Sequence, residues 1–346
     1  MILSTSIRTV AACCACTLVG LPACSATTPA GTAATAASDA ATTAETAASI
    51  DAAKPPAFAD NYPLLAQFPE GGAYDSAGHA FFVGSLSDGS VHRIDAATGA
   101  QATLFTETAK GKWWSLGMDV DVARRHLWVC AMDDRETGSR AGFIWVFDLA
   151  TGKRIANHPL EAAAKDATCT DVAVSKAGVG YVVDREQGNV YAVDLGTGAV
   201  LFAAGADLKG GPVGGQNAVV VLPDESALLS VVYLPPKLVR VDLQSKAVKA
   251  VALTGPFSDD ALLAGADGMA FAKGKAYVAF SSKLVEVTPA DAAWGSAATK
   301  VASVKEGMTD VIATPNGLYL SNGQAVRFAL GQATDPFALV RFAGSF

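Results

Sequence analysis

Three residues far apart in the sequence carry oxygen-bearing side chains at equivalent places in a repeated pattern. Glu70, Asn217 and Asp267 each stand at the start of a short segment that reads as a β-strand. Two carboxylates and an amide form an oxygen-only donor set, which suits Ca²⁺, Mg²⁺ or Mn²⁺ better than zinc or copper. A site of this kind requires a fold that gathers residues separated by much of the chain.

The pattern around these residues occurs six times. Each copy has an opening residue and an apolar strand, then a β-branched or aromatic run, an alternating strand and an outer strand. The opening residues are Glu70, Leu116, Thr170, Asn217, Asp267 and Thr309, separated by 46, 54, 47, 50 and 42 residues. Three alternating strands end in Asp-x-x-Thr-Gly, at 95–99, 148–152 and 194–198, which is typical of a tight turn.

Four short strands per repeat of this length predict an all-β fold, the six-bladed β-propeller with four-stranded antiparallel blades around a central channel. Residues 58–346 provide 289 residues, or about 48 per blade. We expect the strand at 336–342 to pair with 62–68 and close the ring, because an open blade would leave an unpaired edge.

The first strand of each blade lines the channel, so the opening residues form a ring at one mouth. Thr170, Asp171 and Asp310 are additional candidates for this channel site. Two interpretations stay open for the acidic residues. They contribute to a cation site, or they accept hydrogen bonds from backbone amides where the strands begin. Channel carboxylates close together without a cation would raise each other's pKa.

Three motifs resemble those of the SMP-30/gluconolactonase/LRE-like propellers. They are Pro69-Glu70-Gly, Gln216-Asn217-Ala followed by Leu222-Pro223-Asp224, and Ala266-Asp267-Gly268-Met269. The resemblance covers residues 58–346. It implies one divalent cation, most often Ca²⁺ with Mg²⁺, Mn²⁺ or Zn²⁺ as alternatives, held by Glu70, Asn217 and Asp267. It also implies that Asp267 is the catalytic base in hydrolysis of a lactone or small ester at the channel mouth.

The chain departs from that family at two positions. Thr170 stands where the family commonly has a further Asn ligand, and Thr168 where lactonases have an Arg that handles substrate. These losses leave metal binding better supported than specificity for sugar lactones. The alternative is a non-catalytic propeller, anchored at the cell envelope, that binds a ligand or a protein partner.

The N-terminus has the pattern of an export signal. Residues 1–23 contain Arg8 and an apolar stretch of 12 residues, and Leu21-Pro22-Ala23-Cys24 resembles a lipoprotein cleavage site. We therefore expect lipidation of Cys24, with the protein exported to the bacterial envelope on the outer-membrane or periplasmic side. An ordinary cleaved signal is the alternative. Residues 24–57, rich in Ala and Thr, read as a flexible tether.

Three further observations complete the sequence-based predictions. The net charge of −7 argues against a nucleic-acid partner. Cys130 and Cys169, the two Cys of the expected propeller, either form a disulfide or are two small buried apolar residues. Trp113 and Trp114 either line the channel mouth or pack between blades.

Overall fold

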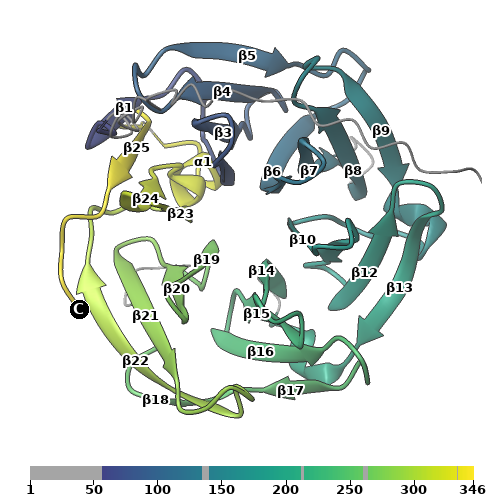
Figure 1. Cartoon of the computed structure of the whole chain (residues 1–346), viewed down its shortest axis with the longest axis vertical. Helices are drawn as coiled ribbons and strands as arrows, with labels where there is room; N and C mark the ends of the chain where they lie inside the picture. Colours follow the sequence, from purple (N-terminus) through teal and green to yellow (C-terminus); the bar gives the residue numbers. More distant parts are fainter. Residues whose placement is uncertain (1–56, 135–139, 212–213, 260–263, 333) are drawn as a thin grey trace, which may run out of the picture. The chain divides into compact units, whose positions relative to one another are not determined.

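The computed structural model describes residues 57–346, except 135–139, 212–213, 260–263 and 333. The predicted signal peptide, Cys24 and most of the tether lie outside the described residues. Six sheets stand in a ring (Figure 1), so the predicted six-bladed β-propeller is confirmed. Within the described part, no helix is long and apolar enough to cross a membrane.

The first three blades follow the chain from the innermost strand outwards. Blade 1 contains β2 (Gly72–Asp75), β3 (Ala80–Gly84), β4 (Val91–Asp95) and β5 (Gln101–Phe105). Blade 2 contains β6 (Trp113–Asp121), β7 (His126–Asp134), β8 (Arg140–Asp148) and β9 (Arg154–Pro159). Blade 3 contains β10 (Asp171–Val174), β11 (Gly180–Val183), β12 (Asn189–Asp194) and β13 (Gly198–Ala204).

The other three blades repeat this order with two additions. Blade 4 contains β14 (Gln216–Val221), β15 (Ala227–Val232), β16 (Lys237–Asp242) and β17 (Val248–Ala250). Blade 5 contains β19 (Met269–Ala272), β20 (Lys275–Ala279), β21 (Lys283–Pro289) and β22 (Ser296–Ser303), with β18 (Ala252–Thr254) added parallel to β22. Blade 6 contains β23 (Asp310–Thr314), β24 (Gly317–Ser321), β25 (Ala338–Arg341) and β1 (Asn61–Pro63).

Short helical segments connect some of the strands. They are η1 (Leu160–Ala162), η2 (Ala206–Leu208) and α1 (Ala325–Ala329), which lies between β24 and β25. The predicted Asp-x-x-Thr-Gly turns form as expected. Asp95 accepts hydrogen bonds from the amide and the hydroxyl of Thr98, and Gly99 takes a positive φ of 72°. Glycine adopts this backbone conformation without steric cost.

The ring closes where β1 pairs with β25, with Tyr62 opposite Leu339. The predicted pairing is therefore correct, but the strand covers only Asn61–Pro63 instead of 62–68. The chain between Pro63 and β2 must pass from the outer edge of blade 6 to the inner edge of blade 1. It therefore leaves the sheet after Pro63, and Phe68 adopts a positive φ of 51° on the way.

Apolar side chains pack between neighbouring blades. Between blades 1 and 2, for example, Phe82 of β3 packs in one cluster with Leu127 of β7 and Trp145 of β8, all at most 1% exposed. Burying a side chain of this size contributes roughly 1.5–3 kcal/mol. These contacts fix the angular position of each blade and so the position of each inner strand around the channel.

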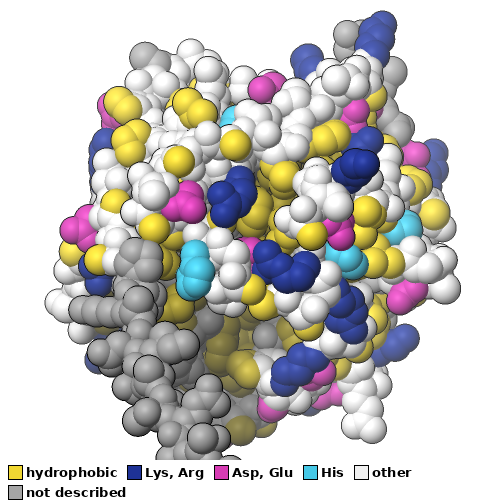
Figure 2. Space-filling model, turned by 45° about the horizontal axis from the view of Figure 1, so that its top comes forward, with side chains coloured by type: hydrophobic (Ala, Val, Ile, Leu, Met, Phe, Trp, Pro, Cys, Tyr) yellow, Lys and Arg dark blue, Asp and Glu magenta, His cyan; other side chains and the backbone are white. Residues whose placement is uncertain are grey.

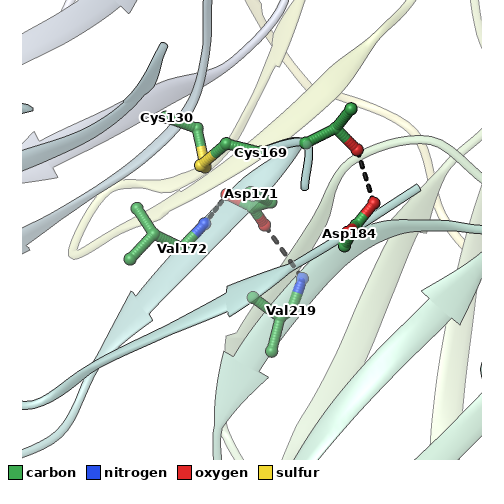
Figure 3. The surroundings of a disulfide bond; sticks show 7 residues. Cys130, Cys169, Asp171, Val172, Asp184 and Val219 are labelled. Carbon is green, nitrogen blue, oxygen red and sulfur yellow. Dashed lines mark hydrogen bonds between the residues drawn. A yellow bond between two sulfur atoms is a disulfide. The ribbon is translucent and has the colours of Figure 1, made fainter. Parts of the chain in front are cut away.

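A disulfide joins blades 2 and 3 (Figure 3). Cys130 of β7 and Cys169, two residues before β10, form this bond, and both are fully buried. Of the two alternatives that the sequence leaves open, the structure has the disulfide. The bond ties the segment that leads into β10 to the neighbouring blade.

We predict that replacing both Cys130 and Cys169 with Ala lowers the free energy of unfolding by about 4 kcal/mol, because a cross-link over 39 residues no longer restricts the unfolded chain. Urea unfolding of the two proteins under non-reducing conditions measures the difference. Wild type treated with a strong reductant is the matched control and should approach the variant. An unchanged unfolding midpoint would contradict the prediction.

Candidate functional site

The structure gathers the predicted site residues at the narrow part of the channel. Glu70, Thr170, Asp171, Asn217, Asp267, Thr309 and Asp310 all line one passage there. They come from the starts of the inner strands of blades 1, 3, 4, 5 and 6. The sixth opening residue, Leu116, lies inside β6, which begins earlier, at Trp113. The ring inferred from the repeats is therefore present, with blade 2 contributing an apolar member.

A larger cavity of about 480 Å³ opens above this passage; we call it the mouth cavity. We call its polar lining residues its polar part; they include Glu70, Thr170, Arg185, Tyr233 and Asp267, with Arg140 and Glu186 also present. We call its apolar lining residues its apolar part; they include Leu86, Trp114, Leu116, Met132 and Phe328. Most of these residues lie on loops or at strand ends, where the rigid sheets hold them in position. The cavity has the size of a small-molecule site.

Arg185 is a site residue that the sequence analysis missed. Its Nη1 donates a hydrogen bond to Oδ1 of Asn217 at 3.4 Å, and Nδ2 of Asn217 in turn donates to Oδ1 of Asp267. The guanidinium also lies 4.7 Å from the ring centre of Tyr233, which is cation–π geometry. The repeat pattern could have revealed Arg185, because this residue follows the second strand of its blade. In a propeller, the turn after the second strand lies at the same mouth as the start of the first strand.

Burial makes the two site carboxylates unusually basic. Removal from water raises the pKa of Asp267 to about 7, opposed by the charge of Arg185 and the hydrogen bond from Asn217. The pKa of Glu70 also lies well above its ordinary value, because burial and the negative charges of Asp267 and Asp310 outweigh Arg185. Perturbed carboxylates in a cavity are typical of functional sites.

Three other channel carboxylates have a structural role, and we call them the bridging carboxylates: Asp119, Asp171 and Asp310. Each accepts hydrogen bonds from the amide of the following residue and from an amide on the inner strand of the next blade. The amides are those of Val120 and Val174 for Asp119, Val172 and Val219 for Asp171 (Figure 3), and Val311 and Gly72 for Asp310, at 2.8–2.9 Å.

Asp171 and Asp310 thus accept hydrogen bonds from backbone amides, which is the second of the two interpretations, and their contribution to a cation site stays a prediction. Asp119 has the same role and was not anticipated, because it lies three residues after the opening residue Leu116, whereas Asp171 and Asp310 directly follow theirs. The close approach also requires glycine next to the carboxylates. A Cβ on Gly117 would lie 2.0 Å from Oδ1 of Asp171, and one on Gly268 would lie 1.9 Å from Oδ1 of Asp310.

Two features of the site bear on the expected divalent cation, namely the hydrogen bonds of Asn217 and the charge of Arg185. Across the described residues, no group of three or more His, Cys, Asp or Glu side chains gathers in a way that could hold a metal ion. Both polar atoms of the Asn217 amide are engaged, and Arg185 brings a positive charge to the site. The cation therefore stays a prediction, and no chemical step below depends on it.

Thr170 and Thr168 have different surroundings. Thr170 is 3% exposed and lines the mouth cavity, and its hydroxyl has no hydrogen-bond partner in the described structure. A ligand atom would satisfy it. Thr168, in contrast, donates a hydrogen bond to the buried carboxylate of Asp184 at 2.5 Å.

The two tryptophans divide between the two predicted roles. Trp114 lines the mouth cavity, with the guanidinium of Arg140 at 5.2 Å from its ring centre. Trp113 packs against Phe143 and Trp145 between blades.

On the face seen in Figure 2, Lys and Arg are interspersed with Asp and Glu. The absence of a nucleic-acid partner stays a prediction.

Comparison with known proteins shows the fold. No family model and no curated protein matches the chain. Among solved structures, it is similar to the major Malassezia sympodialis allergen Mala s 1, with 17% identity, a TM-score of 0.64, and 82% of this chain and 96% of that chain covered. It also resembles the PQQ-bound aldose sugar dehydrogenase from Streptomyces coelicolor, with 13% identity, a TM-score of 0.54 and coverage of 82% and 96%. A nidogen/laminin complex matches at 14% identity and a TM-score of 0.52, over 70% of this chain and 84% of that one. Likeness at this level of identity shows a shared propeller fold, and membership of the SMP-30 group is not shown.

We predict that Asp119 makes the protein more stable at pH 5 than at pH 7. Burial raises its folded-state pKa from 3.8 to about 6, so the folded protein binds this proton more tightly than the unfolded chain does. Its contribution to stability therefore falls as pH rises from about 4 to 6 and beyond, by on the order of 1 kcal/mol between pH 5 and 7.

Urea unfolding of wild type and Asp119→Asn at both pH values measures this contribution. The variant has no titratable group at this position, so it lacks the contribution of Asp119. Its stability at pH 5 relative to pH 7 should therefore be lower than that of wild type. Asp60→Asn, at a side chain that is 83% exposed, is the matched control and should behave as wild type does. Equal pH dependence in wild type and Asp119→Asn would count against the raised pKa.

Proposed function

We propose that the protein binds a small organic molecule in the mouth cavity and hydrolyses a lactone or small ester bond in it. The observation that carries this proposal is the pair of carboxylates, Glu70 and Asp267, in the polar part of the mouth cavity. The apolar part, with Trp114, Leu116 and Phe328, would hold the carbon skeleton of the ligand. The polar part would receive its oxygen atoms.

The residues of the site can divide the work of hydrolysis. Asp267 takes a proton from a water molecule, and the water oxygen attacks the carbonyl carbon of the ester. The positive charge of Arg185 stabilises the oxyanion that forms. The C–O bond to the alcohol oxygen then breaks, and the proton returns from Asp267 to that oxygen. One water is consumed, and the products are an acid and an alcohol, or a hydroxy acid from a lactone.

A non-catalytic binding protein is the second candidate. It is favoured by Thr168, which bonds to Asp184 where lactonases have a substrate-handling Arg. Binding without catalysis needs no reactive group, so the apolar part of the mouth cavity would serve this function equally well. Binding without turnover separates this candidate from the hydrolase.

We predict that Asp267→Asn lowers kcat/KM for hydrolysis by about 10²- to 10⁴-fold, because the amide cannot accept the proton. The assay follows acid release from a panel of lactones and short esters, using the purified full chain with and without a chelator. Asp60→Asn is the control and should keep the wild-type rate. Equal rates in wild type and Asp267→Asn would contradict the role of Asp267. Compounds that raise the melting temperature of wild type without turnover would instead support the non-catalytic candidate.

We also propose that the protein is exported and anchored in the bacterial envelope by a lipid on Cys24. The disulfide between Cys130 and Cys169 supports export, since such bonds form and persist in oxidising compartments. An acylated Cys24 would hold the protein at the membrane surface, and the tether at 24–57 would separate the propeller from it.

We predict that cells expressing the full chain incorporate radioactive palmitate into the protein and that Cys24→Ser loses this label, because it lacks the acceptor thiol. The double variant Cys130→Ala, Cys169→Ala, which removes both cysteines of the propeller, is the control and should be labelled as wild type is. Equal labelling of wild type and Cys24→Ser would overturn the anchor.

A further inference from the structure

We propose that Arg185 is the built-in cation of the channel site and takes the place of a bound divalent metal there. The proposal concerns the charge of the site rather than its turnover. Its test therefore has an outcome independent of the hydrolysis proposed above.

The first argument is the orientation of the Asn217 amide. A metal shared by Glu70, Asn217 and Asp267 would need Oδ1 of Asn217 to face it, but that oxygen accepts the hydrogen bond from Arg185. Turning the amide over does not free the oxygen for a metal. It would point the amide hydrogens at the guanidinium, which has no acceptor, and the oxygen at the Asp267 carboxylate. Both new contacts would be repulsive.

The second argument is the charge balance of the site. Arg185 lines the same cavity as Glu70 and Asp267, and its guanidinium bonds to Asn217, whose amide bonds to Asp267. A divalent ion in contact with these two carboxylates would therefore also lie near the guanidinium and be repelled by it. Arg185 thus already supplies the positive charge that balances the two carboxylates. Unlike a bound metal, it is part of the chain and a chelator cannot remove it.

The third argument is that the surroundings of Arg185 hold it in place. The ring of Tyr233 lies under the guanidinium, and the amide of Gly215 donates a hydrogen bond to the Arg185 carbonyl at 2.9 Å. Gly214 leaves the room that the side chain needs, because a Cβ there would lie 2.2 Å from Nε of Arg185. The glycines at 214 and 215 thus have a role in seating Arg185.

The turn that carries Arg185 is fixed by its neighbour Asp184. This fully buried carboxylate accepts hydrogen bonds from the hydroxyls of Thr168 and Tyr191, at 2.5 and 2.8 Å. It also accepts bonds from the amides of Glu186 and Gln187, at 2.9 and 3.2 Å. Asp184 is therefore a positioning residue: its bonds set the backbone from which Arg185 reaches the channel.

The experiment compares the full-length wild type with Arg185→Met, which keeps much of the side-chain volume and removes the charge. Each purified protein is analysed for bound metal. Its melting temperature is then measured after chelation and after addition of about 1 mM Ca²⁺, Mn²⁺ or Zn²⁺. Arg185→Lys retains a positive charge, and Arg93→Met removes a charge from β4, outside the residues that line the mouth cavity.

We expect wild type, Arg185→Lys and Arg93→Met to contain no stoichiometric metal and to melt at the same temperature with and without added cations. Arg185→Met should gain cation binding, seen as a rise of several degrees in melting temperature. Stoichiometric metal in wild type, or a chelator that lowers its melting temperature, would overturn the proposal. So would an Arg185→Met protein that is as indifferent to cations as wild type. If Arg185→Met fails to fold, Arg185→Gln replaces it, and the wild-type measurements decide the question in either case.

Discussion

The crowding of six inner strands around one axis is the constraint on which the rest of the structure depends. Near the narrow passage, adjacent strands come so close that Gly117 and Gly268 have no room for a side chain. Their backbone amides cannot all pair within the blades. The bridging carboxylates Asp119, Asp171 and Asp310 accept hydrogen bonds from amides on the inner strand of the next blade. Acidic side chains are thus buried at the centre of the fold because the strands need acceptors there.

This arrangement sets the electrostatics of the site. Desolvated carboxylates line the channel, and burial raises the pKa of each of Asp119, Asp171, Asp267 and Asp310. Backbone amides compensate the bridging carboxylates. Glu70 and Asp267 have fewer such donors, and Arg185 with Asn217 provides the compensation. Glu70 and Asp267 therefore differ from the bridging carboxylates in the groups that compensate their charge.

The segment from Thr168 to Thr170 links several of these features. Thr168 bonds to Asp184, which positions Arg185; Cys169 bonds to Cys130 of the neighbouring blade; and Thr170 presents an unsatisfied hydroxyl to the mouth cavity. Three successive residues thus connect the disulfide, the turn that carries Arg185 and the mouth cavity.

The repeated pattern alone was sufficient to predict the six blades, the ring of opening residues and the pairing that closes the propeller. These features follow from strand periodicity and turn residues, which are local and recur in every blade. Four features became visible only in the tertiary structure: the role of Asp171 and Asp310, the disulfide, the placement of Arg185 and the need for Gly214. Each depends on which atoms of one blade meet those of the next. The packing of side chains between the blades sets these contacts, and the sequence of a single repeat does not specify them.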